Sequence, residues 1–168
     1  MVIIRPFRSD DADAVQRLFL EGQRDFMEGH FPAETAQQAL DDYIHSALTG
    51  DLADITATYL ERSGSNFWIA EQDGQPIGCL GVYRRSDAEA EIRRVAVDRN
   101  ARRSGVASRL MDQAEAFCRA AGYARIILWT ASFLTAAIDM YQRRGYRRVA
   151  EEGFPNTSIA IYQYTLDL

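Results

Sequence analysis

The feature that most constrains the fold is a strand, turn, helix and second strand between residues 89 and 129. Residues 90–97 are apolar or β-branched apart from one glutamate and two arginines, which predicts a strand. An arginine-rich turn follows, and from Gly105 to residue 121 apolar side chains recur at helical spacing. After Gly122 comes another apolar run, residues 124–129. Since this order forms a βαβ step, we expect the two strands to be parallel neighbours.

The turn between that strand and that helix is suited to binding phosphate. It delivers residues 102–107 to a helix N-terminus, where the first backbone N–H groups have no intrahelical partner and the helix dipole favours negative charge. The small residues Ser104, Gly105 and Ala107 would let an anion approach the main chain. A solvated helix start with capping arginines is the plainer alternative. The chain has no Walker loop here, since Gly-Lys-Ser/Thr does not follow, and no Gly-x-Gly-x-x-Gly dinucleotide fingerprint.

The rest of the chain adds helices and strands on both sides of this unit. Helices are predicted at residues 10–22, at two segments of 34–60 separated by Gly50, and at 133–144. Strands are predicted at residues 2–7, 67–71, 77–84, 146–151 and 158–166, with hairpin turns at 73–76 and 153–156. With no internal repeat or linker in 168 residues, we expect one domain, residues 1–168, of the α/β class with a mixed, mostly antiparallel sheet.

Composition limits the classes of function. The chain has 24 acidic and 19 basic residues and a formal net charge of −5, so we expect no nucleic-acid partner. Every basic residue is arginine, which excludes lysine Schiff bases and P-loop lysines. Six arginines nevertheless lie close together in and around the turn, where a local basic site would suit a small polyanion: Arg93, Arg94, Arg99, Arg102, Arg103 and Arg109.

Metal, redox and membrane functions have little support in the sequence. Cys79 and Cys118 lie in separate predicted elements without the spacing of a metal site or a redox pair, so we interpret both as core thiols. His30 and His45 are the only histidines, and we expect no metal ion. We find no signal peptide, and no apolar run approaches the ~18 residues that a membrane span requires. A cytoplasmic protein with no membrane partner is therefore expected.

The phosphate turn carries a family resemblance. The segment Arg102-Arg103-Ser104-Gly105-Val106-Ala107 fits Arg/Gln-x-x-Gly-x-Gly/Ala and resembles the acyl-CoA pyrophosphate loop of the GCN5-related N-acetyltransferases (GNAT). The order of predicted elements is similar to that fold from end to end, with helices beside the sheet and a parallel strand pair splayed around the turn. The resemblance implies acetyl-CoA as co-substrate. The loop would bind its phosphates, and main-chain groups of Val95, Ala96 and Val97 would bind the pantetheine arm and the acetyl carbonyl.

A second motif supplies a candidate general acid. The segment Ala137-Ile-Asp-Met-Tyr141-Gln-Arg-Arg-Gly-Tyr146 resembles the family pattern Ala-x-x-x-Tyr-x-x-x-Gly-Phe/Tyr, in which the tyrosine is the usual acid. A phenol with a pKa of about 10 stays protonated near neutral pH and can donate its proton to a departing thiolate. The alternative is that Tyr141 is a half-buried helix residue that packs against the sheet.

Glu91 is the candidate general base, acting directly or through water. It resembles the base of the histone-modifying family members in position, and its strand parity predicts a face shared with Arg93, Val95 and Val97. A carboxylate within a sheet is costly unless it is partnered or functional, so the alternative is an ion pair with Arg93 or with an arginine of a neighbouring strand. Arg93 or Arg94 could pair with a substrate carboxylate, although Arg94 could instead contact helices beside the sheet.

The middle of the chain resembles the camello-like branch of the family, which includes aspartate and cysteine-S-conjugate N-acetyltransferases. The branch implies direct acetyl transfer to a primary amine, such as the α-amino group of an amino acid, an amino-acid conjugate or another small molecule. Animal members carry a hydrophobic membrane segment where residues 30–50 of this chain are polar. The similar segments are Asp51–Ile55, Tyr59, Ser65–Gly74, Glu91–Asp98 and Gly105–Ala107.

Other functions and assemblies stay open at this point. The acceptor could be a protein or peptide amine, and the chain could instead bind acyl-CoA as a sensor without turnover, or serve as an interaction domain. An exposed sheet edge at Ile159 and Ile161 would suit a homodimer formed through the terminal strands, although a loop can also cover such an edge.

Overall fold

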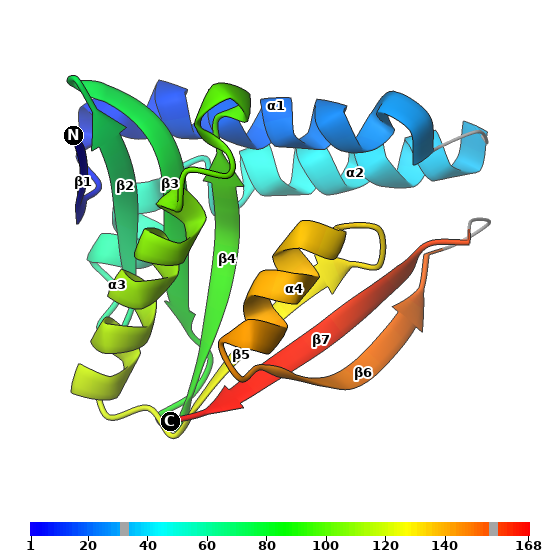
Figure 1. The fold of residues 1–168 in the computed structure, drawn as a ribbon. Coiled ribbons are helices and arrows are strands. Elements are labelled where there is room, and N and C mark those ends of the chain that lie inside the picture. The colour runs from blue at the N-terminus through cyan, green and yellow to red at the C-terminus, as the bar shows by residue number, and fades with distance from the viewer. Residues whose placement is uncertain (31–33, 155–157) are drawn as a thin grey trace.

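The computed structural model describes residues 1–30, 34–154 and 158–168 and contains a seven-stranded sheet of order β1-β2-β3-β4-β5-β7-β6. The strands are β1 (Val2–Pro6), β2 (Asn66–Gln72), β3 (Gln75–Arg84), β4 (Glu89–Val97), β5 (Arg125–Ala131), β6 (Arg147–Gly153) and β7 (Ala160–Asp167). The α-helices are α1 (Ala12–His30), α2 (Glu34–Thr49), α3 (Val106–Ala120) and α4 (Thr135–Arg143). Strands β4 and β5 are parallel and the other neighbouring pairs are antiparallel (Figure 1), which confirms the predicted mixed sheet.

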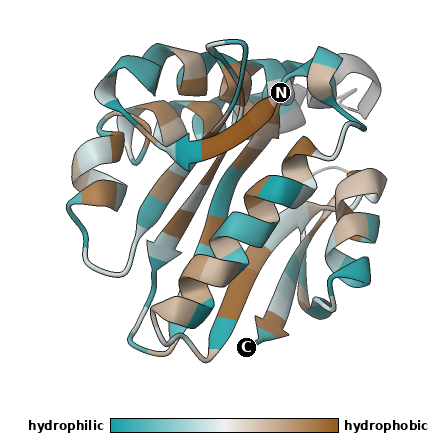
Figure 2. Ribbon diagram, turned by 60° about the vertical axis from the view of Figure 1, so that its left-hand side comes forward, coloured by the Kyte–Doolittle hydropathy of each residue, from teal (hydrophilic) through white to brown (hydrophobic). Residues whose placement is uncertain are grey.

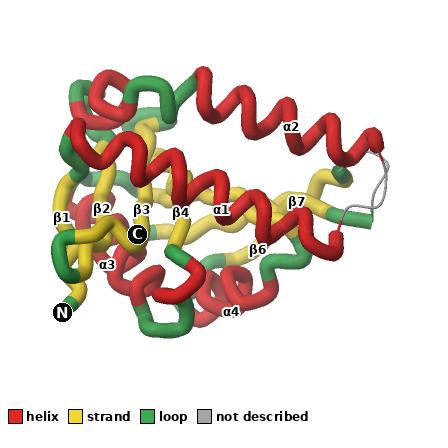
Figure 3. The backbone as a smooth tube through the Cα atoms, turned by 90° about the horizontal axis from the view of Figure 1, so that it is seen from above, coloured by secondary structure: helices red, strands yellow, loops and turns green. Residues whose placement is uncertain are grey.

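Helices cover both faces of the sheet. Helices α1 and α2 lie side by side across one face (Figures 1 and 3), where their apolar side chains cluster with Phe67, Ile69 and Cys79 of the strands. Helices α3 and α4 pack on the other face, in a second cluster that contains Leu110 and Tyr141. Hydrophobic residues are concentrated in the strands, whereas the helices alternate between hydrophilic and hydrophobic residues (Figure 2). Of the helices described, none combines the length and apolar character needed to cross a bilayer.

The parallel pair separates part-way along its length. Strands β4 and β5 pair from Glu89 opposite Arg125 to Ile92 opposite Leu128. Beyond that point the two strands continue without pairing to each other, and Figure 1 shows them diverging. The predicted splayed pair is therefore confirmed, and the turn from β4 to α3 lies at its open end.

Two helix predictions are wrong in extent. Helix α1 does not end at Gly22 but continues to His30, because an interior glycine costs a helix only about 1 kcal/mol relative to alanine. The second helix predicted within 34–60 is much shorter than predicted, a single π-helical turn at Thr56–Leu60. Apolar spacing over so short a segment does not distinguish a helix from compact turns that bury the same side chains.

Strand β4 contains a bulge at Arg94, which changes the predicted faces of this strand. Arg94 has a φ of 56°, and the pairing with β3 shifts register on either side of it. An extra residue reverses the alternation of side chains beyond it. Glu91 and Arg93 therefore lie on the α1–α2 face, whereas Val95 and Val97 pack on the α3 face. The predicted shared face of these four residues is wrong.

The predicted exposed edge at Ile159 and Ile161 is also wrong. Strand β7 lies between β5 and β6, so Ile161 is paired on both sides, and Ile159 is buried. The outer strand is β6, and the position of β7 between β5 and β6 depends on pairing between segments that no local pattern specifies. Residues 155–157, which include part of the predicted turn, lie outside the described residues. A homodimer stays a prediction, without this edge to support it.

Candidate functional site

The turn from β4 to α3 forms a cradle of backbone N–H groups. The Arg109 N–H donates to the Gly105 carbonyl at 3.0 Å, so the N–H groups before it in α3 have no intrahelical partner. Gly105 has a φ of 84°, which favours glycine, and a Cβ there would meet nothing within 4 Å. The space next to the Gly105 Cα is therefore open. A helix start with free N–H groups and small residues can hold a diphosphate.

Two side chains of this loop bind back to the protein. Arg102 donates through Nε to the Val97 carbonyl at 3.1 Å, and its Nη2 lies 2.5 Å from Oδ2 of Asp25 in α1. The Ser104 hydroxyl donates to the Ala101 carbonyl at 2.5 Å. Arg103 is exposed and has a φ of 62°. The loop thus presents main chain to a ligand, while Arg102 fixes the loop to its surroundings.

Tyr141 lies on the same face of the sheet as α3. Its side chain is only 5% exposed, and its ring centroid lies 5.9 Å from that of Tyr146 and 6.3 Å from that of Tyr164. Burial raises the pKa of Tyr141 to about 12. The phenol is therefore protonated at neutral pH, which is the form that a general acid needs.

Glu91 lies on the opposite face. It is 8% exposed, and its Oε2 accepts hydrogen bonds from Arg93 Nη2 at 2.7 Å and from Arg85 Nη1 at 3.3 Å. The Arg93 guanidinium also stacks over the Tyr83 ring, 4.2 Å from its centroid. The ion pair that the sequence offered as the alternative role of Glu91 is therefore present in the structure. It lies next to Ile92, where the pairing of β4 with β5 ends.

The opening between β4 and β5 beyond Ile92, called the splay below, gives access to both of these faces. In a continuous sheet, side chains on opposite faces are separated by the backbone layer. Beyond Ile92 the backbones of β4 and β5 diverge, so a group inserted between them would have the Tyr141 face on one side and the Glu91 face on the other. The arrangement can serve a reaction that protonates a leaving group from one side and removes a proton from the other.

Arg94, one of the two candidates for a substrate carboxylate, already has partners. Its Nε and Nη2 donate to the Asp51 carboxylate at 2.9 and 2.7 Å, and its Nη1 donates to the Tyr43 hydroxyl at 2.9 Å. The Tyr59 hydroxyl donates to Asp51 at 2.5 Å. Burial opposes ionisation of Asp51, but these hydrogen bonds lower its pKa below the usual value. Burial and the Asp51 charge raise the pKa of Tyr59 well above its usual range.

Asp51, Tyr59 and Arg85 have contacts that the sequence pattern does not predict. Asp51 and Tyr59 were visible only as members of the segments that resemble the camello-like branch. Their contact with Arg94 joins residues 43 positions apart, so no local spacing indicates it.

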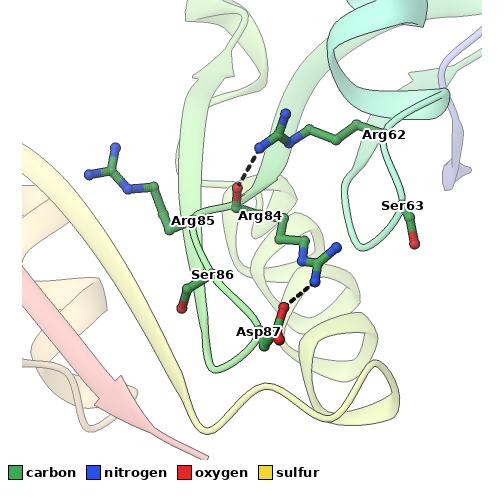
Figure 4. Close-up of a pocket in the computed structure, with 6 residues that line it drawn as sticks. All are labelled: Arg62, Ser63, Arg84, Arg85, Ser86 and Asp87. Carbon is green, nitrogen blue, oxygen red and sulfur yellow. Dashed lines mark hydrogen bonds and ion pairs between the residues drawn. The ribbon is translucent and has the colours of Figure 1, made fainter.

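A pocket of about 350 Å³ lies at the β3–β4 hairpin (Figure 4), at the opposite end of β4 from the turn that leads to α3. Arg62 donates to the Arg84 carbonyl, and Arg84 pairs with Asp87, whereas Arg85 points away from these groups (Figure 4). The pocket is lined by Arg62, Ser63, Arg84, Arg85, Ser86 and Asp87. Through the bond from Arg85 to Glu91, this polar pocket adjoins the α1–α2 side of β4. Within the described ranges, no group of three or more His, Cys, Asp or Glu side chains is placed to hold a metal ion.

Comparison with known proteins gives consistent matches. The model of the acetyltransferase (GNAT) family matches residues 26–146. N-acetylaspartate synthetase of Danio rerio is 36% identical over 110 residues, which are 65% of this chain and 39% of that protein. The Xenopus tropicalis protein named "Probable N-acetyltransferase camello" is 31% identical over 120 residues, 70% of this chain and 53% of that one. The chain thus spans about half the length of these relatives or less.

A solved structure shows the same fold. It is a GNAT family acetyltransferase from Elizabethkingia anophelis with acetyl-CoA bound, and it superposes with a TM-score of 0.65 over 99% of this chain and 98% of that one, at 16% identity.

Proposed function

Because this chain belongs to the acetyltransferase (GNAT) family, in its camello-like branch, we propose that it transfers acetyl from acetyl-CoA directly to a primary amine. The acceptor is the α-amino group of an amino acid, an amino-acid conjugate or another small molecule. The observation that carries the proposal is the splay, where the phosphate cradle, the Tyr141 face and the Glu91 face adjoin one opening in the sheet.

The residues around the splay fit acetyl-CoA. The α3 N-terminus offers N–H groups, and the space at Gly105 is open for the diphosphate. On its β5 side, β4 beyond Ile92 has no strand partner, so main-chain groups of Val95 and Val97 can bind the pantetheine arm and the acetyl carbonyl. A solved GNAT neighbour of the same fold holds acetyl-CoA, which supports this assignment. The thioester supplies an acetyl carbon that is activated toward an amine.

Transfer requires two proton movements. The acceptor nitrogen forms a C–N bond while the C–S bond breaks, so the sulfur gains a proton and the nitrogen loses one. Tyr141, with a pKa of about 12, donates its proton to the departing sulfur and is reprotonated from solvent. Glu91 accepts the nitrogen proton, directly or through water. The acceptor nitrogen attacks only in its neutral form, so the base matters most below the pKa of the acceptor amine.

The acceptor side of β4 is rich in guanidinium groups. Arg94 forms a bidentate pair with Asp51, whereas Arg93 shares a single carboxylate oxygen, that of Glu91, with Arg85. Arg93 is therefore the less firmly held of the two. We therefore assign Arg93 rather than Arg94 to the neighbourhood of a substrate carboxylate. The name of the Danio rerio relative, N-acetylaspartate synthetase, denotes a product that carries carboxylates, which supports an acidic acceptor here.

The test is free-thiol release from acetyl-CoA by the purified protein with amino acids, cysteine S-conjugates, polyamines and short peptides. We expect release with amino acids or their conjugates. In Tyr141→Phe the rate should fall by on the order of 10²-fold, with acetyl-CoA affinity unchanged. Release with peptides alone would assign a protein or peptide acceptor. Acetyl-CoA binding without release would indicate a sensor, and no binding at all would refute the proposal.

A further inference from the structure

We propose that Asp51 is a positioning residue for acetyl transfer, acting through Arg94 on the bulge of β4. The proposal rests on the proposed function, because what Asp51 would position is the backbone that binds the thioester. Asp51 itself lies between α2 and the π-helical turn, outside the sheet. It reaches the bulge through the side chain of Arg94.

Arg94 has an unusual backbone conformation. A φ of 56° lies in the left-handed region, which residues other than glycine adopt only when their surroundings enforce it. At Arg94 the surroundings act on both main chain and side chain. The Cys79 thiol donates to the Arg94 carbonyl at 3.3 Å, and the guanidinium is clamped from outside the sheet.

The contacts that hold the Arg94 guanidinium are largely buried. The Arg94 and Asp51 side chains are 14% and 10% exposed and form a bidentate pair. The Tyr59 hydroxyl donates to the same carboxylate, and the Phe19 ring lies 5.3 Å from the guanidinium. This pair is charge-assisted, bidentate and largely shielded from water. Such a pair holds both side chains in one relative orientation.

The bulge lies at the start of the stretch of β4 that does not pair with β5. Pairing between β4 and β5 ends at Ile92, so Arg94 and Val95 are among the first residues of the unpaired stretch. Bulges re-aim the backbone next to them, and here the β5 side has no ladder to hold the strand. Asp51 thus restrains this part of β4 from the α1–α2 face, because β5 does not pair with it. With this restraint, the Val95 N–H stays directed into the splay.

Amide NMR spectra of the full chain, with CoA and acetyl-CoA as separate probes, would test this proposal. In the wild type, both ligands should shift the loop amides of residues 105–107, and the difference between the two ligands should appear at Val95. In Asp51→Asn the loop shifts should remain and the Val95 difference should disappear. In the same variant kcat should fall by on the order of 10²-fold, while the KM for acetyl-CoA stays within about threefold.

Asp11→Asn is the matched control. Asp11 binds Arg5 through a similarly buried bidentate pair at 2.7 and 2.8 Å, near β1 and away from the splay. Both asparagine variants lose a buried ion pair, but only Asp51→Asn should lose the Val95 difference. If Asp51→Asn does not fold, Tyr59→Phe, which removes one hydrogen bond from Asp51, should weaken that difference.

Two outcomes would overturn the proposal. Wild-type Val95 shifts and wild-type kcat in folded Asp51→Asn, or in Tyr59→Phe where that variant has to be used, would show that Asp51 does not position the bulge. This result would leave the proposed function intact. Absence of any ligand-induced shift in the wild type would instead refute acetyl-CoA binding, and the proposal would fall with it.

Discussion

At the scale of single residues, the ion pairs of Glu91 and its proposed role as general base predict different effects of a substitution. Glu91→Gln keeps the size of the side chain but removes its charge, so Arg93 and Arg85 lose their ionised partner. If Glu91 accepts the amine proton, kcat/KM should fall by on the order of 10²-fold near pH 7 and recover partly as the pH approaches the pKa of the acceptor amine.

The measurement is the pH profile of kcat/KM from pH 6 to 9 for the wild type and the variant. A purely structural ion pair predicts instead a lower melting temperature and a pH profile of unchanged shape. That result would remove Glu91 from the proton path.

The proposed role of Tyr141 as general acid predicts the alkaline side of the pH profile of kcat. A general acid is active while it is protonated, and burial raises the pKa of Tyr141 to about 12, above the ordinary phenol value of about 10. The rate constant kcat should therefore show no loss from this group between pH 7 and about 10.5, measured with an acceptor that is neutral throughout. A fall with a midpoint near 9, absent in Tyr141→Phe, would contradict the assignment.

At the scale of elements, the N-terminus of α3 can be tested by one added charge. Ala107→Glu places a carboxylate in the first turn, where the helix dipole favours it, so the helix should form normally. The same carboxylate would repel the phosphates, and we expect acetyl-CoA affinity to fall by at least ~10²-fold in isothermal titration calorimetry. Arg103→Ala is the control, since its exposed side chain is not needed by a loop that binds through main chain, and its affinity should stay within about threefold. Unchanged affinity in Ala107→Glu would place the ligand elsewhere.

The contact between α3 and the end of α4 depends on Arg144. This residue donates to both oxygens of Glu115 at 2.8 and 3.1 Å and to Ser108 at 3.0 Å, and the Glu115 side chain is 9% exposed. Arg144→Met leaves Glu115 buried without this partner, so the free energy of unfolding in urea should fall by about 3–5 kcal/mol. Arg144→Met with Glu115→Leu should recover most of that loss, because both charges are then absent. Equal stability of the single and double variants would refute this account.

At the scale of the whole molecule, the buried thiols and phenols predict alkaline instability. Burial raises the pKa values of Cys79, Cys118 and Tyr141 to about 12, against about 8.5 for thiols and 10 for phenols in an unfolded chain. The folded state therefore favours the protonated forms. Their contribution to stability is complete below about pH 8.5 and is lost as the pH rises toward 12. Urea unfolding at pH 8, 9.5 and 10.5 should show a declining free energy, and a constant value would contradict these burial effects.

Much of the fold follows from local patterns. The βαβ step was predictable because alternating or continuous apolar runs, a glycine at each helix boundary and a short connection all act on neighbouring residues. The errors arose where local signals are weak. Gly22 is tolerated inside α1, and the apolar spacing at 56–60 produces one turn rather than a helix.

The sequence by itself determined the order of most elements, the turn between β4 and α3 and the resemblance to the GNAT family, because each depends on residues adjacent in the chain. Only the tertiary structure decided which distant groups meet. The pairing of Arg94 with Asp51, the bulge that reverses the faces of β4 beyond Arg93, and the place of β7 between β5 and β6 all depend on contacts between remote segments. Their energies come from burial and ion pairing in three dimensions, which no local spacing of residues records.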